Sequence, residues 1–213
     1  FFQAEDGIRD LYRSATDKPE RDNQLEEIFS KEGAYSIYGL SSVAPVVSGH
    51  SYWSTWPVDT LVQTRKELAE ELRKQLPSDY TYWQTEYCPM EQNPDNPRGG
   101  GGRDLSMNTA LYVARVIHHD LTVANASSWQ WWTAFSEWDY KDGLIFIDDG
   151  TLANGASRGD EKMIETCKQD GVFRTSKLLW TLGNYSFFIR PGMVRLSSVT
   201  TVSYTHLRAP RDS

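Results

Sequence analysis

Three segments in the first two thirds of the chain carry the pattern of buried strands. Residues 42–53 form an apolar, β-branched run that ends in aromatic side chains, and residues 80–86 read YTYWQTE. Residues 121–132 begin with apolar positions and end in WQWW. Short runs rich in Val, Tyr and Trp are typical of strands that are buried in a sheet. We therefore predict a strand in each of these segments.

Amphipathic helices are predicted between these strands. Residues 59–76 repeat leucine with a helical period, and Pro77 ends the repeat. The leucines that share one face are Leu61, Leu68, Leu72 and Leu76, and the charged residues Arg65, Glu70 and Lys74 are expected elsewhere on the helix. Residues 105–119 show a second apolar period, and Asp104 is the predicted N-cap of that helix.

The order of strand, helix, strand, helix and strand predicts parallel β/α units. An open doubly wound sheet and a piece of a (β/α)8 barrel both fit this order. The strand ends favour the barrel, because HSYW, TEYC and WQWW bring aromatic and polar side chains together at carboxyl ends. Barrel enzymes place their active sites at that end of the strands. The predicted fold class is therefore α/β, with a partial (β/α)8 TIM barrel.

The remaining pattern is less regular. Residues 19–30 and 175–182 predict short amphipathic helices, and residues 143–147 and 186–196 predict further strands. Residues 151–171 are polar and contain Asn-Gly and Gly-Asp pairs, which are typical of turns.

Both ends of the chain are expected to be foreign to the native protein. Residues 1–10 contain QAEDGIRD, and residues 199–213 contain VSYTHLRA. Both strings resemble translated adapter sequence and are left out of the fold prediction. The alternative for the second string is a native terminal strand, VTTVSYTHL, which has good β-propensity.

Composition narrows the classes of function. The 213 residues carry a net charge of −7, which argues against nucleic-acid binding, and no apolar run approaches the length of a membrane span. Eight Trp and eleven Tyr are the unusual feature. Core packing explains some of them, and for aromatic faces at a surface sugar rings are one natural partner. Cys88 and Cys167 fit no metal spacing and are predicted to be thiols, with a disulfide as the minor alternative.

Glu86 is the sharpest candidate for chemistry. It ends the predicted strand of residues 80–86, where a carboxylate among aromatic residues is costly unless it is used or paired. An ordinary ion pair at the strand end and a catalytic role are equally compatible with the pattern alone.

Four blocks of the chain resemble glycoside hydrolase family 30. They are SYWSTWPVDTLVQTRKELAEELRK, YTYWQTEYCPMEQN, GGGGRDLSMNTALYVARVIHHDLTVANASSWQWWTAFSEWDYKDGLIFID and SKLLWTLGNYSFFIRPGMVRL, which fall between about Leu11 and Leu196. The resemblance implies barrel strands six, seven and eight within residues 11–183. It further implies that residues 184–198 begin a β-sandwich side domain.

This resemblance implies a retaining β-glycosidase with Glu86 as the nucleophile. The family's acid/base follows strand four, for which no position matches here, so the chain is expected to be an inactive fragment of a longer enzyme. The implied substrates are polysaccharides of the β-1,6-galactan, β-1,6-glucan or xylan type. No cofactor is implied, and the expected location is extracellular or periplasmic.

Five further residues are candidates for substrate binding. His50 and Tyr52 end one predicted strand, Tyr87 follows the nucleophile, and Trp129 and Trp131 share one face of another strand by alternation. Core packing is the competing interpretation for each of them. No metal site is predicted, because the adjacent pair His118-His119 points apart on a helix. Gly99 to Gly102 lack the Lys and Ser or Thr of a phosphate loop and are predicted to form a rim loop.

Two other functions stay open at this point. A non-catalytic carbohydrate-binding barrel fragment fits the aromatic strand ends without the missing acid. An unrelated α/β domain fits the strand and helix order, although no glycine-rich fingerprint follows the first strand.

Overall fold

The computed structural model describes residues 24–148 and 172–196, and the chain divides into two compact units. Unit 1 comprises residues 1–87 and 116–131, and unit 2 comprises residues 88–115 and 132–213. The two adapter-like ends and Cys167 lie outside the described residues.

Unit 1 is built on a parallel sheet. Strands β1 (Val46–His50), β2 (Thr81–Glu86) and β3 (Ser128–Trp129) pair in the order β1-β2-β3, so β2 is central. His50 lies opposite Glu86 after a register shift at the end of β1. Because all three strands run in the same direction, their carboxyl ends meet at one edge of the sheet.

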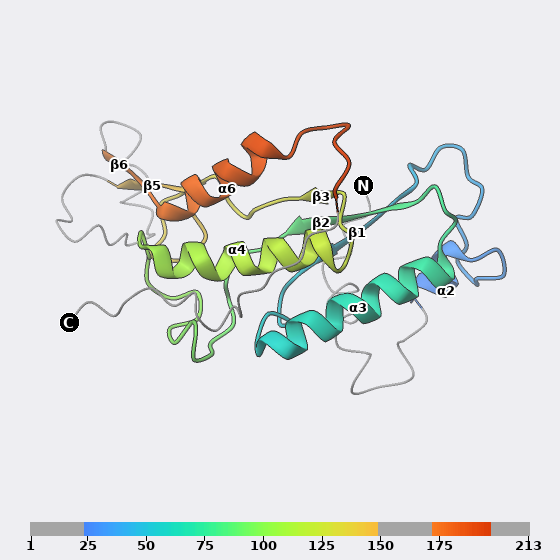
Figure 1. Cartoon of the computed structure of the whole chain (residues 1–213), viewed down its shortest axis with the longest axis horizontal. Helices are drawn as coiled ribbons and strands as arrows, with labels where there is room; N and C mark the ends of the chain where they lie inside the picture. Colours follow the sequence, from blue (N-terminus) through green and yellow to red (C-terminus); the bar gives the residue numbers. More distant parts are fainter. Residues whose placement is uncertain (1–23, 149–171, 197–213) are drawn as a thin grey trace. The chain divides into compact units, whose positions relative to one another are not determined.

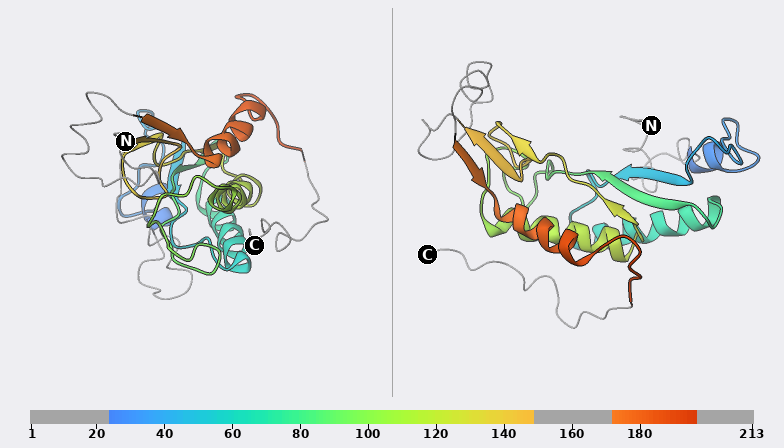
Figure 2. Two further views of the ribbon diagram at one scale, coloured as in Figure 1. Left: turned by 90° about the vertical axis from the view of Figure 1, so that its left-hand side faces the viewer. Right: turned by 90° about the horizontal axis from the view of Figure 1, so that it is seen from above.

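Helices cover one face of this sheet. Helix α3 (Val58–Gln75) and the last part of α4 (Met107–Thr122) lie on the same side of it, and the short α2 (Gln24–Phe29) packs nearby (Figures 1 and 2). The buried core between these elements contains Leu25, Val47, Leu72, Tyr82, Ala124 and Ala126. Alternation in β1 explains the packing, because Val47 is buried while its neighbours on the chain are half-buried.

Unit 2 holds a second sheet and the remaining helices. Strands β4 (Phe135–Ser136) and β5 (Ile145–Asp148) are parallel, and β6 (Val172–Thr175) pairs antiparallel with β5. Helix α6 (Lys177–Phe188) follows. It lies beside the first part of α4, since the Tyr185 hydroxyl donates to the carbonyl of Ala114 at 3.1 Å (Figure 1).

The predicted alternation of strands and helices is confirmed as a mixed α/β fold with parallel strands. Strand β2 and the two long helices begin and end within a few residues of the prediction, and β1 is shorter than predicted. The prediction for residues 121–132 is wrong over most of its length. Helix α4 continues to Thr122, Asn125 turns the chain with φ 59°, and only residues 128–129 pair as a strand. The apolar residues at the start of this segment belong to the last turn of α4.

The strand predicted at residues 186–196 is also wrong. Residues 186–188 belong to α6, and residues 189–196 form no strand. Ser176 caps the helix through a bond from the Leu179 amide, and a capped helix gains a hydrogen bond with each added residue. It ends shortly before Pro191, which keeps the preceding residue out of the helical conformation. The side domain expected from residue 184 therefore stays a prediction.

The described residues form two small sheets and no closed barrel. The order β1-β2-β3 is the one expected for three consecutive barrel strands, and β1 and β2 are each followed by a helix that covers the same face of the sheet. A partial barrel stays a prediction.

Candidate active site

Glu86 ends the central strand of unit 1, at the edge where the carboxyl ends of the parallel strands meet. The buried side chain of Gln84, two residues earlier, fixes the backbone of Glu86, because its Nε2 donates to the carbonyl oxygen of Glu86 at 2.6 Å. The Glu86 side chain itself is only partly buried. The strand therefore presents a carboxylate that water and a ligand can reach.

Tyr52 contacts the Glu86 carboxylate directly. Its hydroxyl donates to Oε1 of Glu86 at 2.9 Å, and the tyrosine is 7% exposed. The ring of His50 lies against Tyr52, edge to face, with centroids 5.8 Å apart. A buried phenol held by neighbouring rings can fix one carboxylate oxygen and leave the other to face a reactant.

Aromatic rings line the next positions along the same edge. Tyr87 is fully buried, and its ring centroid lies 5.6 Å from Tyr52, 6.4 Å from Trp129 and 6.3 Å from Trp131. The two indoles stack with centroids 6.2 Å apart and planes at 23°. This geometry confirms that Trp129 and Trp131 share one face. Both are partly exposed, so together they form an accessible aromatic wall.

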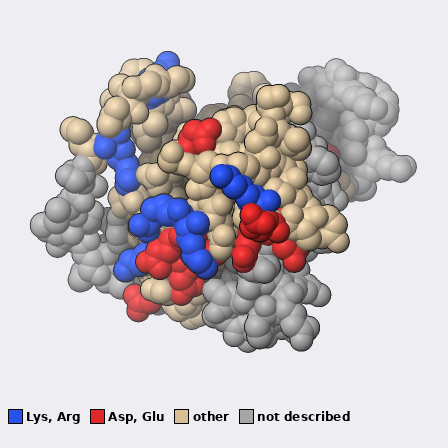
Figure 3. Space-filling view, turned by 90° about the vertical axis from the view of Figure 1, so that its right-hand side faces the viewer, with Lys and Arg blue, Asp and Glu red and all other residues tan. Residues whose placement is uncertain are grey.

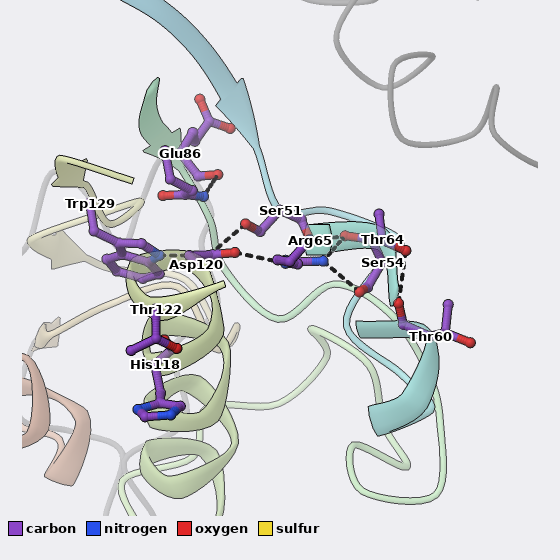
Figure 4. Close-up of polar contacts among 11 residues, drawn as sticks. Ser51, Ser54, Thr60, Thr64, Arg65, Glu86, His118, Asp120, Thr122 and Trp129 are labelled. Atoms are coloured by element: carbon purple, nitrogen blue, oxygen red, sulfur yellow. Dashed lines mark hydrogen bonds and ion pairs between the residues drawn. The ribbon is translucent and has the colours of Figure 1, made fainter. Parts of the chain in front are cut away.

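A buried ion pair lies behind this edge (Figure 4). Nε of Arg65 donates to Oδ1 of Asp120 at 2.8 Å, and both side chains are 0% exposed. The other oxygen of Asp120 accepts the Ser51 hydroxyl at 2.7 Å and the Trp129 indole N–H at 2.8 Å. Asp120 therefore accepts three hydrogen bonds and is shielded from solvent, which indicates a structural role for this side chain.

The same arginine closes the turn after β1. Nη1 of Arg65 donates to the carbonyl and the hydroxyl of Ser54 at 2.7 and 2.6 Å, and the Ser54 hydroxyl donates to the carbonyl of Ser51 at 3.1 Å. We call the set of Ser51, Ser54, Arg65 and Asp120 the buried clamp. It holds both ends of the turn that carries Tyr52 toward Glu86.

Sequence reasoning missed the buried clamp. Arg65 was expected away from the apolar face of its helix, and this expectation is wrong because the residue is fully buried. The sequence does contain a signal for its burial, because Arg65 lies four residues after Leu61 and three before Leu68, on the same face of the helix as the leucines. Asp120 carried a second signal, because an acidic side chain in the last turn of a helix opposes the helix dipole unless it has a partner.

The described part of the chain offers no cluster of three or more His, Cys, Asp or Glu that could hold a metal ion. The rings of His118 and His119 are perpendicular, with centroids 5.2 Å apart. No described helix is long and apolar enough to cross a membrane. On the face in Figure 3, basic and acidic side chains lie next to one another. Such a pair within helix α3 is Lys74 and Glu71, whose charged groups lie 3.5 Å apart.

In unit 2, the expected rim loop is fastened by a lysine. Nζ of Lys141 donates to Oδ1 of Asn96 at 2.6 Å and to the carbonyl of Gly99 at 2.8 Å. Burial lowers the pKa of Lys141. Gly100 lies so close to the ring of Tyr140 that a Cβ at this position would overlap it. The glycine run thus serves close packing of the loop in this unit.

Asp104 binds the first turn of α4 as predicted, but the helix begins at Met107, and the residue directly before it is Ser106, whose hydroxyl accepts the Asn108 amide at 3.2 Å. Asp104 accepts the Ser106 amide at 2.8 Å and the Thr109 amide and hydroxyl at 3.2 and 2.7 Å. Burial raises the pKa of Asp104, but these hydrogen bonds outweigh it and leave the pKa below its ordinary value. Cys88, at the start of unit 2, is buried.

All six site residues predicted from the sequence belong to unit 1. Their roles in binding and catalysis stay predictions. They form one chain of contacts that runs from His50 through Tyr52 to Glu86 and, by way of Tyr87, to Trp129 and Trp131. The site therefore combines an accessible carboxylate, a fixed hydroxyl donor and a pair of stacked indoles.

Comparison with known proteins finds a matching family model and similar solved structures. The family model for O-glycosyl hydrolase family 30 matches residues 3–146. Among solved structures, the crystal structure of a conserved exported protein from Bacteroides fragilis is similar, with 35% sequence identity and a TM-score of 0.68. The match covers 86% of this chain and 35% of that protein, so the chain spans about a third of its length. No match is found among curated proteins.

Proposed function

The chain belongs to O-glycosyl hydrolase family 30, and on that premise we propose that it is part of a retaining β-glycosidase whose nucleophile is Glu86. The observation that carries the proposal is the 2.9 Å hydrogen bond from Tyr52 to Oε1 of Glu86 at the end of the central strand. An oriented, solvent-accessible carboxylate beside an aromatic wall suits attack on a sugar.

The reaction would proceed by two displacements. The free oxygen of Glu86 attacks the anomeric carbon, the glycosidic C–O bond breaks, and a second carboxylic acid protonates the leaving oxygen. The resulting glycosyl ester is then attacked by a water that the second group deprotonates, which releases the sugar with its configuration retained. Tyr52 keeps Glu86 in position in both steps.

The second carboxyl group is expected from a part of the enzyme that this chain does not include. Retention needs it about 5–5.5 Å from the nucleophile. Among the described residues of unit 1, Asp120 is the buried carboxylate, and the buried clamp already occupies both of its oxygens. We therefore expect the 213 residues alone to hydrolyse no glycoside, whereas the full-length enzyme is active.

The proposed substrate is a β-linked polysaccharide of the β-1,6-galactan, β-1,6-glucan or xylan type. The paired indoles support a sugar ligand, because flat apolar rings suit the C–H faces of pyranoses. The similarity to an exported protein supports a location outside the cytoplasm.

The test is covalent labelling of the full-length enzyme. A mechanism-based fluorosugar should add one sugar mass to the peptide that contains Glu86, and Glu86→Gln should abolish both labelling and turnover because an amide forms no glycosyl ester. Glu67→Gln on α3 is the matched control and should behave as the wild type. A label on another residue would refute the assignment of the nucleophile. Sugar binding without turnover in the full-length protein would instead favour a non-catalytic carbohydrate-binding function.

A further inference from the structure

Trp53 has a backbone conformation that a bulky residue rarely adopts. It follows Tyr52 in the turn after β1, its φ is 59°, and its side chain is 53% exposed. The left-handed region suits glycine or asparagine and disfavours other L-residues. A surface turn with no other requirement would place Gly or Asn here, as Asn125 does at the other positive φ of a non-glycine residue in the described chain.

The buried clamp explains how this conformation persists. The residues on both sides of Trp53 are buried, and the clamp fixes the turn through Ser51 at one end and Ser54 at the other. Strained residues persist where the surroundings determine the backbone from several directions, and they concentrate at functional sites. The turn therefore holds an indole at the surface although the backbone at that position disfavours it.

The place of this indole suggests its use. Its Cα is one peptide unit, about 3.8 Å, from the Cα of Tyr52. The Tyr52 hydroxyl in turn contacts Glu86. An exposed aromatic ring beside the reaction centre can stack on a sugar ring that neighbours the one under attack.

We propose that Trp53 is a stacking platform for a second sugar unit of the substrate, next to the unit that Glu86 attacks. The ligand class is a β-linked oligosaccharide, and the inference rests on the proposed function of Glu86. Trp53 thereby makes the site prefer a sugar chain over a single glycoside.

The proposal is tested in the full-length enzyme with two substrates. One is the β-linked oligosaccharide of the galactan, glucan or xylan type that the enzyme cleaves fastest, and the other is the aryl glycoside of its single sugar. For Trp53→Ala, the loss of kcat/KM should be about tenfold larger on the oligosaccharide than on the aryl glycoside. Trp56→Ala is the matched control, because Trp56 is 41% exposed in the same loop without a positive φ, and it should leave this ratio unchanged.

A second variant separates binding from structure. Trp53→Gly should lose the same preference and yet keep or raise the Tm, because glycine accepts the left-handed conformation. A lower Tm for Trp53→Gly, or equal losses on both substrates, would show that Trp53 is a structural residue and overturn the proposal.

A binding measurement distinguishes the proposal that Trp53 binds sugar from the proposal that Glu86 is the nucleophile. In the Glu86→Gln background, calorimetric titration with the same oligosaccharide should give a Kd about tenfold weaker when Trp53 is replaced by Ala. If turnover depends on Glu86 but neither the ratio nor the Kd responds to Trp53, only the platform is wrong. If turnover does not depend on Glu86, the proposed function fails, and the Kd comparison still decides whether Trp53 binds sugar.

Discussion

The indole of Trp129 and the hydroxyl of Ser51 share a single acceptor, Oδ2 of Asp120, at 2.8 and 2.7 Å. One buried oxygen thus joins the aromatic wall at the end of β3 to the turn after β1. Any change at Asp120 should therefore disturb both sides of the candidate site at once.

Removing Asp120 should strongly destabilise the protein. Asp120→Ala leaves Arg65 as a buried charge without its carboxylate, which typically costs about 3–5 kcal/mol. Urea denaturation of the full-length protein measures the loss. The exposed Asp79→Ala control should stay within about 0.5 kcal/mol of the wild type. The double variant Arg65→Met, Asp120→Leu should recover part of the stability. A loss below about 1 kcal/mol for Asp120→Ala would contradict a structural role for the pair.

Tyr52→Phe should lower activity with little change in fold. The variant removes only the hydroxyl that contacts Oε1 of Glu86. A hydrogen bond to a charged group contributes about 1.5–3 kcal/mol, so we expect kcat/KM to fall by about 10- to 100-fold. The measurement is the steady-state kinetics of Tyr52→Phe, with Tyr80→Phe, a change at a second tyrosine of unit 1, as the control. Similar kinetics for both variants would mean that the observed contact does not support catalysis.

The two stacked tryptophans should differ in what they contribute. Trp131→Ala should mainly reduce catalytic efficiency, by about 1–3 kcal/mol of aromatic contact with the substrate. Trp129→Ala should also lower stability, because its N–H is bonded to the buried Asp120. Kinetics and thermal unfolding of both variants separate these effects. If both retain wild-type kinetics, the pair belongs to the core and does not bind substrate.

The sequence alone could predict which residues lie around Glu86. Parallel strands bring their carboxyl ends together, so polar and aromatic residues at the ends of β1, β2 and β3 were expected to meet. Alternation placed Trp129 and Trp131 on one side, as the stacked rings confirm. The specific bond from Tyr52 to Glu86 needed the register shift at the end of β1, which no local pattern reveals.

The errors have a common physical cause. The sequence pattern predicts Arg65 away from the leucine face of α3, although a buried partner 55 residues away makes its burial possible. Residues 186–188 are predicted to begin a strand, although they continue the helix that Ser176 caps. In both cases a partner elsewhere in the chain outweighed the local preference.

The cap at Asp104 should make stability depend on pH. Its pKa is depressed in the folded protein, so its contribution is present above the unfolded value of 3.8 and is lost as the pH falls through the folded value. Asp104→Ala should cost about 1 kcal/mol at pH 7, and the gap to the wild type should narrow in more acidic solution. Urea denaturation at pH 7 and pH 3 tests this. Asp104→Asn retains a cap that does not titrate, so its difference from Asp104→Ala should not change with pH.

The all-parallel pairing in unit 1 also governs how the chain can acquire its structure. Thr85 and Gly49 are bonded across β2 and β1 although they lie 36 residues apart, and Ser127 meets Tyr82 across 45 residues. No hairpin can start such a sheet, so each strand pair forms only after an intervening helix has been synthesised and docked. A chain that folds slowly exposes unpaired strand edges for longer and is therefore more prone to aggregate. During expression, lower temperature and slower synthesis should therefore raise the soluble yield more than any change of residues at the active site.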